Sequence, residues 1–228
     1  MQSELKYWYL RNHKLFWVLS NSQIKQLCII SRFKQAKKGD IIYLPNDDVP
    51  KVYFLKKGNI KIVFNDDQGN EIIKDIIRTG DLFGELGLQE GTDSEEQAVA
   101  LTNDVVICSF LLADFENLMQ QYPDLAISYT KLVGFQLRRI KNNYSNLVFK
   151  DAKSRLISFL KDWCEKEGQI IGTEIQIKNY LTQNEIAQII CTSRQTATQL
   201  LNEMEESGIL KYDRKLITIL KPAEILSN

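Results

Sequence analysis

The hydrophobic pattern of this chain changes near Asp114, from the alternation of strands to the spacing of helices. Between Phe33 and about Phe110, short apolar segments rich in β-branched residues are separated by turn sequences such as Lys57-Gly58-Asn59. Their spacing of roughly ten residues is typical of an antiparallel sandwich or barrel. The expected strands lie at residues 40–44, 52–55, 60–64, 72–77 and 105–110. The chain after Asp114 is expected to be mainly helical.

A long helix is predicted at residues 124–147, directly after the helix-breaking Pro123. Its apolar residues recur at the a and d positions of a heptad repeat, which is typical of a coiled-coil seam between two copies of a chain. An alternative for so short a run is a helix that packs on its own sheet. The residues of this heptad stripe are Val133, Leu137, Ile140, Tyr144 and Leu147.

The residue counts exclude several classes of protein. Because His13 is the single histidine, the chain cannot build a multi-histidine metal site, and the sequence shows no nucleophile, base and orienting group of an enzyme. We therefore expect no metal, no cofactor and no catalytic residue. The four cysteines form no CxxC pair, the first residues lack a signal peptide, and no stretch approaches the roughly 20 apolar residues of a membrane span. These features predict a soluble cytoplasmic protein without a membrane partner.

The sequence after residue 151 carries the pattern of a winged helix-turn-helix. Thr182-Gln-Asn-Glu185 has the form of a capping box, and Thr192-Ser-Arg-Gln195 repeats that form ten residues later. Two helices that begin at these caps are joined by a tight turn. The apolar segments 208–211 and 216–220, on either side of a polar turn, then predict a hairpin.

The outward face of the second of these helices is polar, and its side chains suit the edges of DNA bases. Arginine pairs with guanine in the major groove, and glutamine or asparagine pairs with adenine. The alternative is a helical hairpin whose polar face is only solvated, but basic residues on the following hairpin favour DNA. The expected face consists of Arg194, Gln195, Thr198, Gln199 and Asn202, and the basic residues are Lys211, Arg214, Lys215 and Lys221.

Residues 181–201 contain Thr-x-x-Glu-Ile-Ala followed by Ser-Arg-x-Thr, and in this they resemble the helix-turn-helix of the cyclic AMP receptor protein/FNR (Crp/Fnr) family. Lys57-Gly58-Asn-Ile-Lys-Ile, Gly80-Asp81-Leu-Phe and Gly84-Glu-Leu-Gly-Leu88 resemble the β-roll of the same family. The resemblance covers about residues 36–222. It implies an α+β fold with an N-terminal double-stranded β-helix (a cyclic-nucleotide-binding-like β-roll), a long dimerisation helix and a C-terminal winged helix-turn-helix.

The same resemblance implies a homodimer that regulates transcription from a pseudo-palindromic operator in double-stranded DNA, in contact with RNA polymerase. We expect a β-roll effector-like domain with N-terminal helices at residues 1–123. The dimerisation helix and a hinge follow at 124–150, and the DNA-binding domain at 151–228.

Seven residues of the helix-turn-helix match family positions that contact DNA. Gln195 stands where the family has an acidic base-reading residue, and Gln199 stands where it often has arginine. These departures predict an operator that depends less on guanine and tolerates more A·T pairs. Cys191 stands at a turn position that is usually glycine. The base-reading positions are Arg194, Gln195 and Gln199, and the supporting or backbone-contacting positions are Thr182, Ser193, Thr196 and Thr198.

Relatives that bind cyclic nucleotides hold the ribose and the phosphate with a Gly-Glu-Leu segment and an arginine ten residues after its glutamate. This chain keeps the segment, but an acidic residue replaces the arginine, and no Lys or Arg occurs in residues 79–130. Because a phosphate there would meet uncompensated carboxylates, we predict a degenerate pocket that does not bind cyclic AMP or cyclic GMP. The residues of this degenerate pocket are Gly84, Glu85, Leu86, Glu95 and Glu96.

The two adjacent acidic residues of the pocket, Glu95 and Glu96, are expected on a solvated loop. An alternative function follows from them. In that hypothesis the protein is a sensor whose acidic loop binds a cation, or a neutral or basic small molecule, and so switches DNA binding.

Overall fold

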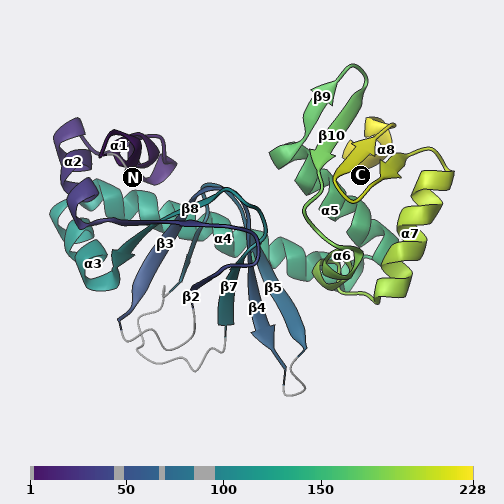
Figure 1. The fold of residues 1–228 in the computed structure, drawn as a ribbon, viewed down its shortest axis with the longest axis horizontal. Helices are drawn as coiled ribbons and strands as arrows, with labels where there is room; N and C mark the ends of the chain where they lie inside the picture. Colours follow the sequence, from purple (N-terminus) through teal and green to yellow (C-terminus); the bar gives the residue numbers. More distant parts are fainter. Residues whose placement is uncertain (1–2, 44–48, 67–69, 85–95, 228) are drawn as a thin grey trace. The chain divides into compact units, whose positions relative to one another are not determined.

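The computed structural model of the chain describes residues 3–43, 49–66, 70–84 and 96–227. The chain forms two compact units, Met1–Arg138 and Arg139–Asn228. Strands dominate the first unit, and helices with a small sheet make up the second (Figure 1). This mixture confirms the predicted α+β fold.

The strands of the first unit are antiparallel and follow the apolar segments of the sequence. Among the residues described, they form two sheets of four strands, ordered β1-β8-β3-β6 and β2-β7-β4-β5. A strand occurs at each of the five predicted places, because β-branched segments between glycine-containing turns favour extended backbone. The strands are β1 (Arg32–Ala36), β2 (Ile41–Tyr43), β3 (Lys51–Lys57), β4 (Ile60–Asn65), β5 (Glu71–Ile77), β6 (Leu82–Gly84), β7 (Glu96–Ala100) and β8 (Val105–Leu111).

Strands β1, β6 and β7 were not among the predicted segments, and β7 corrects one expectation. Its sequence begins with Glu96 and contains two alanines, which have low strand propensity, but it pairs with β4 and β2 inside its sheet. Glu96 lies opposite Phe64, and its carboxylate accepts a hydrogen bond from Lys74 Nζ at 2.8 Å. The expectation of a solvated loop at Glu96 is therefore wrong. Glu95 lies outside the described residues.

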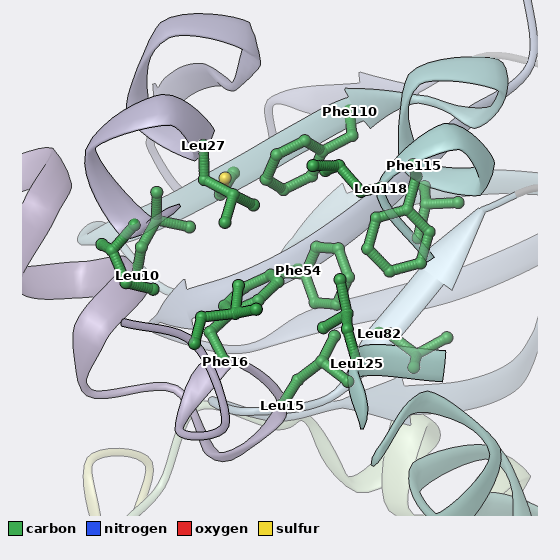
Figure 2. Packing of buried hydrophobic residues seen from close by; sticks show 14 residues of the cluster. Leu10, Leu15, Phe16, Leu27, Phe54, Leu82, Phe110, Phe115, Leu118 and Leu125 are labelled. Atoms are coloured by element: carbon green, nitrogen blue, oxygen red, sulfur yellow. The ribbon is translucent and has the colours of Figure 1, made fainter. Parts of the chain in front are cut away.

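Aromatic rings fill the centre of the core of the first unit (Figure 2). Phe54 on β3 contacts Phe16, Phe110 and Phe115, with ring centroids 5.4, 5.8 and 5.6 Å apart. Tilted and edge-on ring pairs of this kind add about 0.5–1.5 kcal/mol each to the effect of burial. The helical segments that contribute to this core are α1 (Ser3–Arg11), the 3-10 helix η1 (Lys14–Phe16), α2 (Asn21–Ile30), α3 (Leu112–Gln121) and, through Leu125, α4 (Pro123–Phe149).

His13 joins the N-terminal helices to a turn of the roll. Its Nδ1 accepts a hydrogen bond from the Leu15 backbone N–H at 3.3 Å, so the proton of the neutral ring lies on Nε2, which contacts the Gly80 backbone oxygen at 3.1 Å. Burial, with a smaller contribution from the charge of Lys56, lowers the pKa of His13 from 6.5 to about 3. The single histidine is therefore a neutral structural link, a role that the sequence did not indicate.

Lys56 is a buried cation of the same core. Its Nζ lies 5.2 Å from the ring centroids of both Phe16 and Phe54, and it has no hydrogen-bond partner among the described residues. Burial lowers the pKa of Lys56 to about 8. The faces of the two rings stabilise the ammonium partly, as in other cation–π contacts.

Helix α4 (Pro123–Phe149) is the long helix that the sequence predicted. Its first residue is Pro123. Proline has no backbone N–H, but this group would have no hydrogen-bond partner within the helix at its first position, so proline is tolerated there. Leu125 is buried, and Gln136 Nε2 donates a hydrogen bond to the Leu82 backbone oxygen at 2.9 Å. The heptad stripe is exposed in the single chain, with exposed fractions of 37% at Val133, 52% at Leu137, 59% at Ile140, 68% at Tyr144 and 45% at Leu147. The described residues of the chain thus leave this stripe in solvent.

The second unit has the winged helix-turn-helix arrangement that the sequence predicted, with a sheet ordered β11-β12-β10-β9. Trp163 is fully buried in it and contacts Phe159 and Tyr180, with ring centroids 5.2 and 5.1 Å apart. The β9–β10 hairpin and the short α8 were not predicted. The elements are α5 (Ala152–Glu167), β9 (Gln169–Ile171), β10 (Glu174–Lys178), α6 (Gln183–Ile189), α7 (Arg194–Glu206), β11 (Leu210–Tyr212), β12 (Leu216–Ile219) and α8 (Pro222–Leu226).

Candidate nucleic-acid interface

Helix α6 begins at the capping box that the sequence predicted. Thr182 Oγ1 accepts a hydrogen bond from the Glu185 N–H at 3.2 Å, and Glu185 Oε2 accepts one from the Thr182 N–H at 2.8 Å. Two backbone donors of the first turn are satisfied in this way. The hydroxyl of Thr182 is therefore occupied inside the protein.

The turn after α6 is a Schellman motif with Cys191 in the left-handed position. The Cys191 N–H donates to the Gln188 oxygen at 3.0 Å and the Thr192 N–H donates to the Ala187 oxygen at 2.9 Å, the two bonds that define this motif. Cys191 has a φ of 52°, a conformation that costs a non-glycine residue about 1–2 kcal/mol. The turn therefore holds Cys191 in a conformation that the chain would otherwise avoid.

Helix α7 starts one residue later than the repeated capping box indicated. Ser193 is its N-cap, with Oγ accepting a hydrogen bond from the Thr196 N–H at 3.1 Å. Thr192 cannot cap α7 because its backbone completes the preceding Schellman motif. Gln195 is consequently the second residue of the helix, and the predicted capping box between Thr192 and Gln195 is wrong.

Helices α6 and α7 pack through their apolar faces. Leu200 is half-buried, whereas the other apolar residues on these faces are almost completely buried. This packing turns the opposite, polar side of α7 outward. The buried residues are Ile186, Ala187, Ile190, Ala197 and Leu201.

The outward side of α7 carries the three residues assigned to base reading. Arg194, Gln195 and Gln199 are all exposed, and they share one surface with Thr198 and Asn202. Arg194 and Gln195 make no side-chain hydrogen bond to any described residue. Their donors and acceptors therefore point to solvent in the protein alone.

The supporting residues are instead bonded within the protein. Thr198 Oγ1 donates to Gln183 Oε1 at 2.9 Å, which links α7 to the first turn of α6. The hydroxyls of Ser193 and Thr196 lie 2.9 Å apart and bond to each other. These side chains fix the start of α7 relative to α6.

The far end of the same surface is acidic. Gln199 Nε2 donates a hydrogen bond to Glu203 Oε1 at 2.9 Å, and Glu206 lies one turn further along the helix. This bond orients the amide, leaving one N–H and the oxygen of Gln199 for another partner. The contact between Gln199 and Glu203 was not among the predicted ones, although their i,i+4 spacing indicates it.

The β11–β12 hairpin carries the four basic residues that the sequence assigned to it and its flanks. Lys211, Arg214 and Lys215 are exposed. Lys221 is exposed too, but its Nζ donates to the Ser207 backbone oxygen at 3.0 Å, at the carboxyl end of α7. Lys221 therefore caps α7, and a DNA contact by it would compete with this bond.

The predicted degenerate pocket is described only in part. Gly84 has a φ of +99°, and a Cβ there would lie 2.6 Å from both the Lys51 oxygen and Tyr53 Cδ2, so its backbone position requires glycine. The Glu96 carboxylate forms an ion pair with Lys74, which lies outside the segment 79–130 that contains no Lys or Arg. Glu85, Leu86 and Glu95 lie outside the described residues.

Metal-binding clusters and membrane-spanning helices are both absent from the described part of the chain. It contains no group of three or more His, Cys, Asp or Glu side chains placed to hold a metal ion. In the same residues, no helix combines the length and the apolar character that crossing a membrane requires.

Two families match successive parts of the chain. Residues 33–122 match the cyclic nucleotide-binding domain, and residues 154–226 match the Crp-like helix-turn-helix domain. The first match covers the strands of the roll, and the second covers α6, α7 and the hairpin.

Relatives match over most of the chain. The cAMP-activated global transcriptional regulator Vfr of Pseudomonas aeruginosa is 30% identical over 86% of this chain and 92% of its own length. A global nitrogen regulator of Synechocystis is 29% identical over 86% of this chain and 87% of its own. In solved structures, a CooA mutant from Carboxydothermus hydrogenoformans aligns with a TM-score of 0.74 and 26% identity, over 95% of this chain and 94% of that one.

Proposed function

Because this chain belongs to the Crp/Fnr family of DNA-binding transcription regulators, we propose that it binds a pseudo-palindromic operator as a homodimer and reads bases with Arg194, Gln195 and Gln199. The observation that carries this proposal is the polar outward side of α7, where Arg194 and Gln195 have no partner among the described residues. Side chains with unused donors and acceptors on an exposed helix are suited to base edges in a major groove.

The exposed heptad stripe of α4 supports the proposed dimer. Five apolar side chains at a and d positions bury well against the same stripe of a second copy. A two-fold dimer then presents two α7 helices to half-sites about 34 Å apart. By family resemblance, the dimer acts in the cytoplasm, together with RNA polymerase and without a catalytic step of its own.

Selection of operators from random DNA tests the proposed reading. Two glutamines and one arginine per half-site are expected to enrich sequences in which adenine contacts outnumber guanine contacts. An Arg194→Ala variant is expected to lose preference at one base pair per half-site, at a cost of about 1–3 kcal/mol for each mismatched contact. A Lys211→Ala variant serves as control, because loss of a phosphate contact weakens binding uniformly across sequences. Guanine-rich half-sites from the wild type would contradict the prediction.

The effector region leads to a second part of the proposal, the absence of cyclic nucleotide binding. The relative Vfr is described as activated by cAMP. In this chain the position of the phosphate-binding arginine is held by Glu95, and the next residue, Glu96, already pairs with Lys74. That ion pair also neutralises part of the negative charge that would attract a cation. The alternative hypothesis of a cation sensor is therefore weaker.

Calorimetric titration with cyclic AMP checks this prediction. The wild type is expected to give no binding heat at micromolar nucleotide, because like charges about 4 Å apart repel by roughly 1–4 kcal/mol. A Glu95→Arg variant restores the family residue and is expected to gain affinity. Micromolar binding by the wild type would refute the prediction.

A further inference from the structure

One arginine outside α7 joins two helix ends in the second unit. Arg155 lies on α5 and is half-buried. Its Nε donates to the Ile190 oxygen at 2.7 Å, and its Nη2 donates to the Cys191 oxygen at 3.1 Å. Its Nη1 donates to the Lys150 oxygen at 2.6 Å. All three acceptors are backbone carbonyls.

These carbonyls belong to places where the backbone lacks other partners. Ile190 is the C-cap of α6, Cys191 is the left-handed residue of the turn, and Lys150 directly follows α4. The last carbonyls of a helix have no intrahelical donor and carry the negative end of the helix dipole. A cation placed between two such ends is stabilised by both. The planar fork of a guanidinium can reach three carbonyls at once, which an ammonium cannot do with the same geometry.

Lys150 is held from a second side. Its Nζ donates to Ser158 Oγ at 2.8 Å, and Asp151 caps α5 by accepting from the Ser154 N–H at 2.7 Å. The segment between α4 and α5 therefore has a defined backbone, and Arg155 connects that backbone to the turn of the helix-turn-helix.

We propose that Arg155 is a positioning residue for DNA binding, which holds the Cys191 turn and thereby fixes the start of α7 relative to the end of α4. The inference rests on the proposed function, because it takes α7 as the reading helix. Ser193, the cap of α7, is two residues after Cys191, so a change at the turn moves Arg194 and Gln195 directly. Arg155 itself does not read bases in this role.

The test compares Arg155→Gln with Lys153→Gln in the full chain. Lys153 is exposed on the same helix, so both variants lose one positive charge, and their binding to non-specific DNA is expected to fall by the same small factor. Arg155→Gln alone is expected to bind a selected operator about ten- to hundredfold more weakly, because charge-assisted bonds to three carbonyls are lost. Equal operator affinities of the two variants would overturn the proposal.

Hydrogen exchange in the protein without DNA gives an independent readout. The amides of Cys191 and Thr192 are expected to exchange faster in Arg155→Gln and at the wild-type rate in Lys153→Gln. Unchanged exchange in Arg155→Gln would show that the guanidinium does not hold the turn. If the wild type fails to distinguish an operator from other DNA, the proposed function fails, while this exchange comparison still decides the role of Arg155 at the turn.

A second substitution separates positioning from general stability. Cys191→Gly adopts a positive φ without steric cost, so it is expected to restore part of the operator affinity of Arg155→Gln. Independent, additive effects of the two substitutions would contradict the proposal. If Arg155→Gln does not fold, Arg155→Lys, which keeps the charge but not the fork, is judged by the same exchange and affinity criteria.

Discussion

Replacing Ile140 with aspartate is expected to leave the protein monomeric and to weaken its binding to a complete operator by about 10²–10⁴-fold. Ile140 lies in the middle of the heptad stripe and is 59% exposed in the single chain. In a two-fold dimer the substitution places two carboxylates in the apolar seam, and each loses several kcal/mol of hydration. Sedimentation equilibrium and DNA titration measure the two effects.

The matched control for this prediction is Phe135→Asp. Phe135 is 65% exposed and lies on the same helix. Because it lies five residues before Ile140, its side chain faces away from the heptad stripe. This variant introduces the same charge in place of an equally apolar residue and is expected to remain a dimer. A dimeric Ile140→Asp protein, or equal loss of DNA affinity in both variants, would contradict the proposed seam.

Acid is expected to destabilise the first unit through His13. The pKa of His13 in the folded protein is about 3, against 6.5 in the unfolded chain, so the unfolded state binds the extra proton. The contribution of the neutral ring to stability is complete above pH 6.5 and is lost progressively as the pH falls towards 3. The expected slope is about 1.4 kcal/mol per pH unit, and the total is about 4–5 kcal/mol. Chemical denaturation at a series of pH values measures the slope.

Because His13 is the single histidine, its ring resonances also report its titration directly by NMR. A ring that titrates near pH 6.5 in the folded protein would refute the prediction. Lys56→Met removes the second-largest cause of the lowered pKa, so the slope is expected to become shallower. At pH 7 the same variant is expected to raise the free energy of unfolding by about 1–3 kcal/mol, because it replaces a buried cation with an apolar side chain of similar length.

Local sequence patterns predicted the elements that depend on neighbouring residues. The Thr182–Glu185 capping box and the long helix α4 were both found near their predicted positions. The start of α7 was placed one residue early, because the role of Thr192 depends on how α6 ends. The pattern alone does not contain that information.

Contacts between distant parts of the chain could not be predicted from sequence patterns. Arg155 bonds to residues 35 and 36 positions away, and Glu96 pairs with Lys74 across an intervening strand. Only the folded chain brings these partners together. The absence of Lys and Arg from residues 79–130 therefore did not predict the charge around Glu96, because its partner Lys74 lies outside this segment.

The exposed stripe of α4 also makes the stability of the protein depend on its concentration. In the proposed dimer, the folded chain is stabilised by its second copy, so mass action applies to folding itself. The midpoint of thermal unfolding is expected to rise with protein concentration in the wild type and to be constant in Ile140→Asp. A cell that makes little of this regulator would then hold a less stable form of it, so its abundance would control both its occupancy of DNA and its lifetime.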